Sequence, residues 1–175
     1  MGKIFIGGDK SCGIHNEADM IKSLVRNFSK WKIVNDYKNA DIIIIIETCM
    51  STYSNLVDSI SYVENVLNEK NKDSRVVVSG CLARGIKFEL NEKQKSILNR
   101  VTCVKSDKII ECVSNLIGID SSKGIVDEYR LPFSISGVRM AVSPVSGCLN
   151  HCSFCKSNYI NFNLNSIPFN YLEKV

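Results

Sequence analysis

Eight cysteines are the residues of this chain best suited to chemistry, and six of them form two groups of three. The close triad has the spacing C-x3-C-x2-C and consists of Cys148, Cys152 and Cys155. The distant triad consists of Cys12, Cys49 and Cys81. The chain shows no export signal, and cytosolic thiols stay reduced. Clustered cysteines therefore indicate metal binding or catalysis rather than disulfides.

The spacing of the close triad lets a single loop wrap around a metal centre. A 4Fe–4S cluster takes thiolate ligands, and three cysteines leave one iron open for chemistry. Zinc is the alternative, because His151 would complete a Cys3His set. Since His151 and Cys152 are neighbours in the chain, they converge poorly with the other ligands on one tetrahedron. The iron–sulfur interpretation is therefore favoured.

Each cysteine of the distant triad follows a predicted strand at its carboxyl end. In an open parallel sheet the loops after the strands share one edge, where ligand sites form. We therefore expect Cys12, Cys49 and Cys81 to converge. The alternative is that they are small buried hydrophobic residues, but three of them in equivalent places disfavour it. Cys103 and Cys112, within VTCVK and IIECV, are expected to pack in the core.

Continuous aliphatic runs and helical periodicity predict the elements that would position these thiols. Strands are expected at 3–7, 31–34, 42–46, 75–79 and 101–104, and helices at 16–28, 53–68, 94–98 and 107–116. Strands that alternate with helices and are apolar throughout indicate a parallel sheet covered on both faces. Residues 1–118 are therefore predicted to form a small doubly wound α/β domain. Residues 119–138 read as a linker, and a new unit begins at residue 139.

Composition agrees with a globular chain. It has 175 residues, of which 45% are hydrophobic and 23% charged. The net charge of +4 permits an anionic partner such as nucleic acid without requiring one. No apolar run approaches the ~20 residues of a membrane-spanning helix. We expect a cytoplasmic protein without membrane contact.

Four segments together resemble a known family. Residues 147–156, GCLNHCSFCK, resemble the radical S-adenosylmethionine motif, with the aromatic Phe154 before the third cysteine. The segments SCGIHN, ETC and SGCLA around Cys12, Cys49 and Cys81 resemble the three cysteine boxes of the methylthiotransferase N-terminal domain. Within that family, residues 147–156 look most like the branch that modifies threonylcarbamoyladenosine in transfer RNA.

The resemblance implies two 4Fe–4S clusters and S-adenosylmethionine as cofactors. Cys148, Cys152 and Cys155 would hold the cluster that binds S-adenosylmethionine and reduces it to a radical, with Phe154 near the adenine. Cys12, Cys49 and Cys81 would hold an auxiliary cluster at which sulfur is supplied. The implied substrate is a modified adenosine next to the anticodon of transfer RNA, and an electron donor is the implied second partner.

The chain departs from the family in length and in one loop. Only residues 156–175 follow Cys155, whereas a full α/β barrel takes ~250 residues. Residues 139–175 are therefore expected to be the truncated start of a radical S-adenosylmethionine partial barrel. The family's Arg-Gly after the third cysteine is replaced by residues 157–161, SNYIN. Two alternatives stay open: a stand-alone iron–sulfur cluster-binding module, and a methylthiotransferase that acts on a protein side chain. A zinc-binding interaction domain ranks below both.

Overall fold

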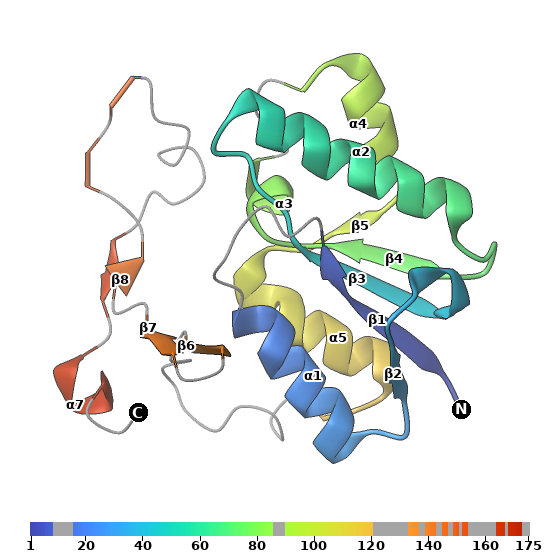
Figure 1. The fold of residues 1–175 in the computed structure, drawn as a ribbon, viewed down its shortest axis with the longest axis horizontal. Helices are drawn as coiled ribbons and strands as arrows, with labels where there is room; N and C mark the ends of the chain where they lie inside the picture. The colour runs from blue at the N-terminus through green and yellow to red at the C-terminus, as the bar shows by residue number, and fades with distance from the viewer. Residues whose placement is uncertain are drawn as a thin grey trace.

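The computed structural model contains a five-stranded parallel sheet with helices on both faces (Figure 1). It describes residues 1–8, 16–85, 90–120, 133–136, 139–142, 145–146, 149–150, 152–153, 164–166 and 168–172. The strands are β1 (Lys3–Gly8), β2 (Lys32–Val34), β3 (Ile42–Glu47), β4 (Arg75–Val78) and β5 (Thr102–Cys103). Their order in the sheet is β2-β1-β3-β4-β5, and all pairs are parallel. The predicted α/β class is confirmed.

The sheet places β3 at its centre, between β1 and β4. Gly8 of β1 pairs with Glu47, and Ile45 of β3 pairs with Val78. The three strands therefore end at nearly the same level. Because they are parallel, the segments that follow them leave the sheet at one edge, which we call the carboxyl edge.

Two pairs of helices cover the two faces of the sheet (Figure 1). Helices α1 (Asn16–Phe28) and α5 (Ile109–Ile117) pack on one face, and α2 (Tyr53–Glu69) and α4 (Glu92–Leu98) pack on the other. A short helix, α3 (Cys81–Gly85), follows β4. Two 3-10 turns, η1 (Tyr37–Asn39) and η2 (Ser106–Lys108), complete the domain. Helices on both faces confirm the doubly wound arrangement.

Local signals in the sequence explain where the helices begin and end. The Thr52 side chain caps α2 by accepting a hydrogen bond from the backbone of Asn55. Asn91 and Gln94 form a reciprocal capping box at α4, so that helix begins at Glu92, two residues before its predicted start. Gly118 ends α5 in the left-handed conformation, with φ of 72°.

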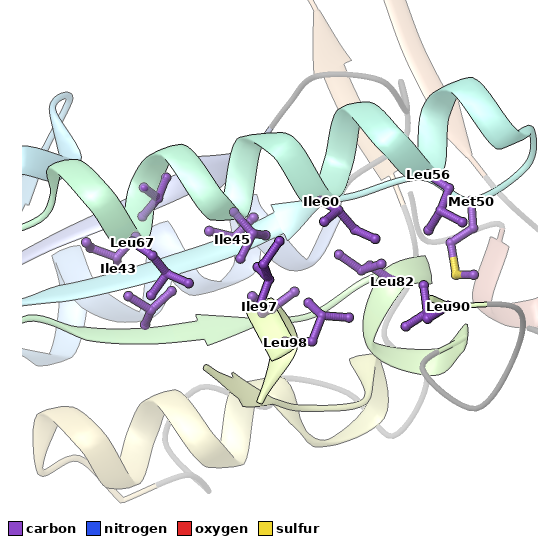
Figure 2. Packing of buried hydrophobic residues seen from close by; sticks show 14 of the residues in the cluster. Ile43, Ile45, Met50, Leu56, Ile60, Leu67, Leu82, Leu90, Ile97 and Leu98 are labelled. Atoms are coloured by element: carbon purple, nitrogen blue, oxygen red, sulfur yellow. The ribbon is translucent and has the colours of Figure 1, made fainter. Parts of the chain in front are cut away.

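The isoleucine run of β3 supplies both cores by strand alternation. Ile43 and Ile45 pack against α2 and α4, whereas Ile42, Ile44 and Ile46 pack against α1 and α5. Figure 2 shows the first core, which contains Ile60 of α2, Ile97 of α4 and Leu82 of α3 together with the strand side chains. Both faces of β3 are thus apolar, which explains why its sequence does not alternate.

The C-terminal segment forms short antiparallel pairs. β6 (Phe133–Ser136) pairs with β7 (Arg139–Val142), and β8 (Val145–Ser146) pairs with β9 (Asn165–Ser166). A four-residue helix, α7 (Phe169–Leu172), follows. β6 thus falls inside the range 119–138 that was expected to be a linker. The domain boundaries and the start of a barrel stay predictions. Among the described residues, no helix is both long and apolar enough to cross a membrane.

Removing side-chain volume from the centre of the sheet should be costly. Ile44 is completely buried against α1 and α5, so we expect Ile44→Ala to lower the free energy of unfolding by about 2–5 kcal/mol. The control is Val57→Ala on the exposed side of α2, where Val57 is 36% accessible and a change under ~1 kcal/mol is expected. Urea denaturation followed by circular dichroism measures both. Equal losses in the two variants would contradict the assigned core.

Candidate metal centre at the carboxyl edge

The structure places two cysteines of the distant triad after neighbouring strands. Cys49 lies two residues beyond the end of β3, and Cys81 begins α3 directly after the turn that follows β4. Cys12 follows β1, the other neighbour of β3, but it lies outside the described residues. The sheet order thus places the segments of Cys49 and Cys81 at one edge, and the convergence of Cys12 with them stays a prediction.

The buried side chain of Thr48 links the Cys49 segment to the Cys81 segment. Its hydroxyl donates to the carbonyl oxygen of Ser79 at 2.8 Å and accepts from the backbone N–H of Leu82 at 3.2 Å. Thr48 is 1% exposed, so these bonds lie away from water. One hydroxyl therefore fixes the backbone on both sides of Cys81 relative to the residue that precedes Cys49.

Gly80 allows this close approach because no side chain fits at its position. Its φ is 78°, in the left-handed region that glycine adopts without strain. A Cβ at Gly80 would collide with the carbonyl oxygen of Ile46 and would lie 2.9 Å from Oγ1 of Thr48. The turn before Cys81 can therefore pack directly on the end of β3 only with glycine there.

A serine of α2 holds the backbone of Cys49. The N–H of Cys49 donates to Oγ of Ser59 at 2.9 Å, and the same hydroxyl donates to the carbonyl oxygen of Cys49 at 3.2 Å. Ser59 is completely buried. The residues after the two cysteines, Met50 and Leu82, are buried in the core cluster that also contains Leu56 and Ile60 (Figure 2). Both cysteines are thus anchored from the core side.

Three hydrogen-bonding groups surround the sulfur of Cys49. The backbone N–H of Ser51 donates to it at 3.5 Å, and the side-chain amide of Asn55 donates at 3.4 Å. The Oγ of Ser51 lies 3.1 Å from the sulfur. Hydrogen-bond donors compensate negative charge on a sulfur ligand and tune an iron–sulfur cluster. This environment suits a cysteine that serves as a thiolate ligand.

The carboxyl edge also contains a buried polar atom that lacks a partner. Ser79, two residues before Cys81, is completely buried, and its Oγ makes no hydrogen bond within the part of the chain that the structure describes. Buried hydroxyls are normally paired. Ser114 of α5 has a second unpaired Oγ among the described residues, so this feature is not confined to the carboxyl edge. The described ranges, which omit Cys12, contain no group of three potential metal-ligating side chains.

Cys103 and Cys112 have the environment of packing residues. Both are half-buried. Cys103 packs against the core under α2 and α4, and Cys112, itself in α5, packs against the core under α1 and α5. Burial raises the pKa of Cys103 to about 11. Burial, followed by the nearby Glu111 carboxylate, also raises the pKa of Cys112. In both places the surroundings disfavour the thiolate that metal ligation requires, as expected for packing residues.

The structure describes only one residue of the close triad. Cys152 is exposed, next to a turn at Ser153. Cys148, Phe154 and Cys155 lie outside the described residues, as does His151. The ligand set of the close triad therefore stays a prediction.

Sequence reasoning missed the polar residues that support Cys49 and Cys81. Thr48, Ser51, Asn55 and Ser59 make the hydrogen bonds described above. The signal was the polar composition of residues 48–59, TCMSTYSNLVDS, beside a strand that is otherwise aliphatic. Their roles depend on bonds across the sheet edge, which residue spacing alone does not reveal.

Comparison with known proteins connects this edge to a family. The model of the uncharacterized protein family UPF0004 matches residues 11–101, a range that includes Cys12, Cys49 and Cys81.

Among curated proteins, the chain is similar to proteins named ribosomal protein uS12 methylthiotransferase RimO. Identity to the protein from Natranaerobius thermophilus is 28% over 149 residues, covering 79% of this chain and 33% of the relative. Identity to the protein from Helicobacter hepaticus is 30% over 135 residues, covering 75% of this chain and 30% of the relative. Identity to the protein from Sulfurovum sp. is 26% over 153 residues, covering 86% of this chain and 35% of the relative. The chain thus spans about a third of the length of the curated relatives it matches.

These relatives correct one expectation from the sequence. Their names specify a ribosomal protein as the substrate, so the prediction of a transfer RNA substrate and partner, modified at an adenosine beside the anticodon, is wrong. That prediction rested on residues 147–156. These residues surround the predicted cluster ligands, and a cluster-binding loop reports on the cofactor rather than on the substrate. The alternative of a protein side chain as substrate fits better.

Removing the Thr48 hydroxyl should weaken the carboxyl edge. Thr48→Val keeps the shape but leaves the N–H of Leu82 and the carbonyl of Ser79 without their partner. We expect a loss of about 1–3 kcal/mol in the free energy of unfolding. Thr48→Ser keeps the hydroxyl and should retain most of that stability. Urea denaturation of both variants makes the comparison, and a Val variant as stable as the Ser variant would refute the bridging role.

Proposed function

The chain belongs to the radical S-adenosylmethionine methylthiotransferase family, and we propose that it provides the sulfur-supplying site of an enzyme that methylthiolates a protein side chain. The observation that supports this most is the coincidence of two independent results. The family match spans all three cysteines of the distant triad. The strands that precede them are adjacent and parallel in the sheet.

Members of this family generally use iron–sulfur clusters and S-adenosylmethionine. In this chain Cys12, Cys49 and Cys81 would hold one 4Fe–4S cluster. Cys148, Cys152 and Cys155 would hold a second, with Phe154 beside the adenine of S-adenosylmethionine. When bound, the second cluster with S-adenosylmethionine supplies one-electron chemistry at an unactivated carbon, and the first supplies the sulfur.

The residues of the chain itself position the ligands and keep them away from water. Thr48 ties the Cys81 segment to β3, Gly80 permits the close turn, and Ser59 holds the backbone of Cys49. Cys49 is 6% exposed, so its thiol is shielded from solvent by the protein. Because the segment of such a ligand is already ordered, metal binding causes a smaller loss of conformational entropy.

A protein substrate follows from the names of the relatives. They are named for ribosomal protein uS12, and we propose the same class of substrate, a side chain of a ribosomal protein, for this enzyme. Residues 1–118 would form the domain of the auxiliary cluster, and residues 139–175 would belong to the domain that binds S-adenosylmethionine. A ribosomal substrate and thiolate ligands would both fit the cytoplasm, and we propose that compartment.

The two triads should contribute separately to iron binding. After anaerobic reconstitution, we expect the variant with alanine at Cys12, Cys49 and Cys81 to lose roughly half of the bound iron and sulfide. The variant with alanine at Cys148, Cys152 and Cys155 should lose the other half, because a 4Fe–4S cluster needs its thiolate ligands. Iron and sulfide analysis measures both. Cys103→Ala with Cys112→Ala is the matched control and should keep the full content. If either triple variant kept the full iron content of the unmodified protein, the two-site proposal would be overturned. Bound zinc in place of iron would favour a zinc-binding interaction domain.

The substrate is tested by offering both candidates to the same enzyme. The protein expressed from its complete gene is reconstituted and incubated with reductant, S-adenosylmethionine, and either ribosomal protein uS12 or unmodified transfer RNA. We expect mass spectrometry to find a methylthio group on uS12 and none on the RNA. Product on the RNA would refute the substrate class. No product on either, from protein that holds both clusters, would favour a stand-alone cluster-binding module.

A further inference from the structure

We propose that Asn55 is a positioning residue for the cluster of the distant triad: its side-chain amide and the Ser51 hydroxyl direct hydrogen bonds onto the Cys49 sulfur and thereby raise the reduction potential of the cluster. This inference rests on the proposed function, because it takes Cys49 as a ligand. The two claims nevertheless fail in different ways in the experiment below.

The amide of Asn55 uses both of its hydrogens in this network. Nδ2 lies 3.4 Å from the Cys49 sulfur and 2.9 Å from Oγ of Ser51. An amide nitrogen has two N–H groups, so it can donate to both acceptors at once. Asn55 therefore contacts the sulfur directly and also holds the neighbouring hydroxyl.

The bond from Asn55 determines which way the Ser51 hydroxyl points. Ser51 Oγ lies 3.1 Å from the sulfur, and as a contact between two neutral groups either atom can be the donor. A thiolate bound to iron has no proton and can only accept. Since Oγ already accepts from Asn55, its own proton is available for the sulfur. With the backbone N–H of Ser51, a metal-bound Cys49 then receives three donors.

The position of Asn55 in α2 explains why its side chain reaches back to the cysteine. Its backbone N–H donates to the capping Thr52 at 3.1 Å, which places it in the first turn. Side chains in a helix lean toward the N-terminus, so Asn55 projects over the segment that precedes the helix. Asn55 is half-buried and Cys49 is buried, so the bond is partly shielded from water, and a hydrogen bond is electrostatically stronger where water is excluded.

Donors at a ligand sulfur favour the more negative state of a cluster. One-electron reduction adds a negative charge that is spread over the irons and their sulfur ligands. Hydrogen bonds to those sulfurs stabilise that charge, which raises the reduction potential. Asn55 would thus help to determine how readily the cluster accepts an electron.

The experiment isolates this cluster in the full chain by replacing Cys148, Cys152 and Cys155 with alanine. In that background, Asn55→Leu removes the donors with little change in volume. Asn55→Asp keeps the shape but presents acceptor oxygens and a negative charge to the sulfur. Ser54→Asp is the matched control. Ser54 is the exposed preceding residue, it bonds Asp58 at 3.5 Å, and the substitution adds the same charge in the same helical turn.

Dithionite titration followed by electron paramagnetic resonance measures the midpoint potential; each dithionite-derived electron reduces one cluster. We expect Asn55→Leu to lower the ratio of reduced to oxidised cluster at a fixed potential by roughly three- to tenfold, where tenfold corresponds to about 59 mV. Asn55→Asp should lower it further. Ser54→Asp should change it by less than about twofold. Circular dichroism establishes that α2 is retained, and the Asp variant provides the test should the Leu variant not fold.

The outcomes separate the two claims. Retention of iron by Cys49→Ala in the same background would refute Cys49 as a ligand, and the proposed site with it. Loss of iron in Cys49→Ala, with both Asn55 variants within twofold of the parent, would leave the site intact and overturn the role of Asn55. Equal shifts for Ser54→Asp and Asn55→Asp would also overturn it, because the effect would then be one of general charge.

Discussion

The parallel alignment of β1, β3 and β4 is the constraint on which the candidate metal centre depends. Adjacent parallel strands end at one edge, so Cys49 and Cys81 follow neighbouring strand ends although they lie far apart in sequence. The isoleucine run in β3 fits this arrangement, because it is buried by a helical layer on both faces of the sheet. An antiparallel β4 would send Cys81 to the opposite end of the sheet.

Within that frame, a few polar contacts turn proximity into a defined site. The hydroxyl of Thr48 and that of Ser59 are both buried and both bond to backbone groups around the cysteines. Each such bond is worth about 1 kcal/mol net, but leaving its buried partner unpaired costs more. These groups are therefore better suited to holding the two segments in one arrangement than to stabilising the domain as a whole. The larger stabilisation comes from the two apolar cores.

The sequence was a good guide where local patterns decide the structure. The aliphatic runs predicted all five strands, and the 3.6-residue period predicted α1 over its full observed length. It was a poorer guide where tertiary contacts decide. Helix α3 is only five residues long, too short for a periodic pattern, and it forms where Gly80 packs on the end of β3. The sheet order and the hydrogen bonds to the Cys49 sulfur likewise depend on residues brought together by folding. The substrate was inferred wrongly because the residues used for it belong to a cofactor loop.

The central claim is that cysteines from three separate segments of the chain share one iron–sulfur cluster at the carboxyl edge. Anomalous X-ray diffraction at the iron absorption edge, from crystals of the anaerobically reconstituted protein, tests it most directly. The account predicts an iron peak at this edge, within bonding distance of the sulfur atoms of Cys12, Cys49 and Cys81. Iron bound elsewhere, or an iron peak that contacts Cys103 or Cys112 while the carboxyl edge holds none, would contradict it.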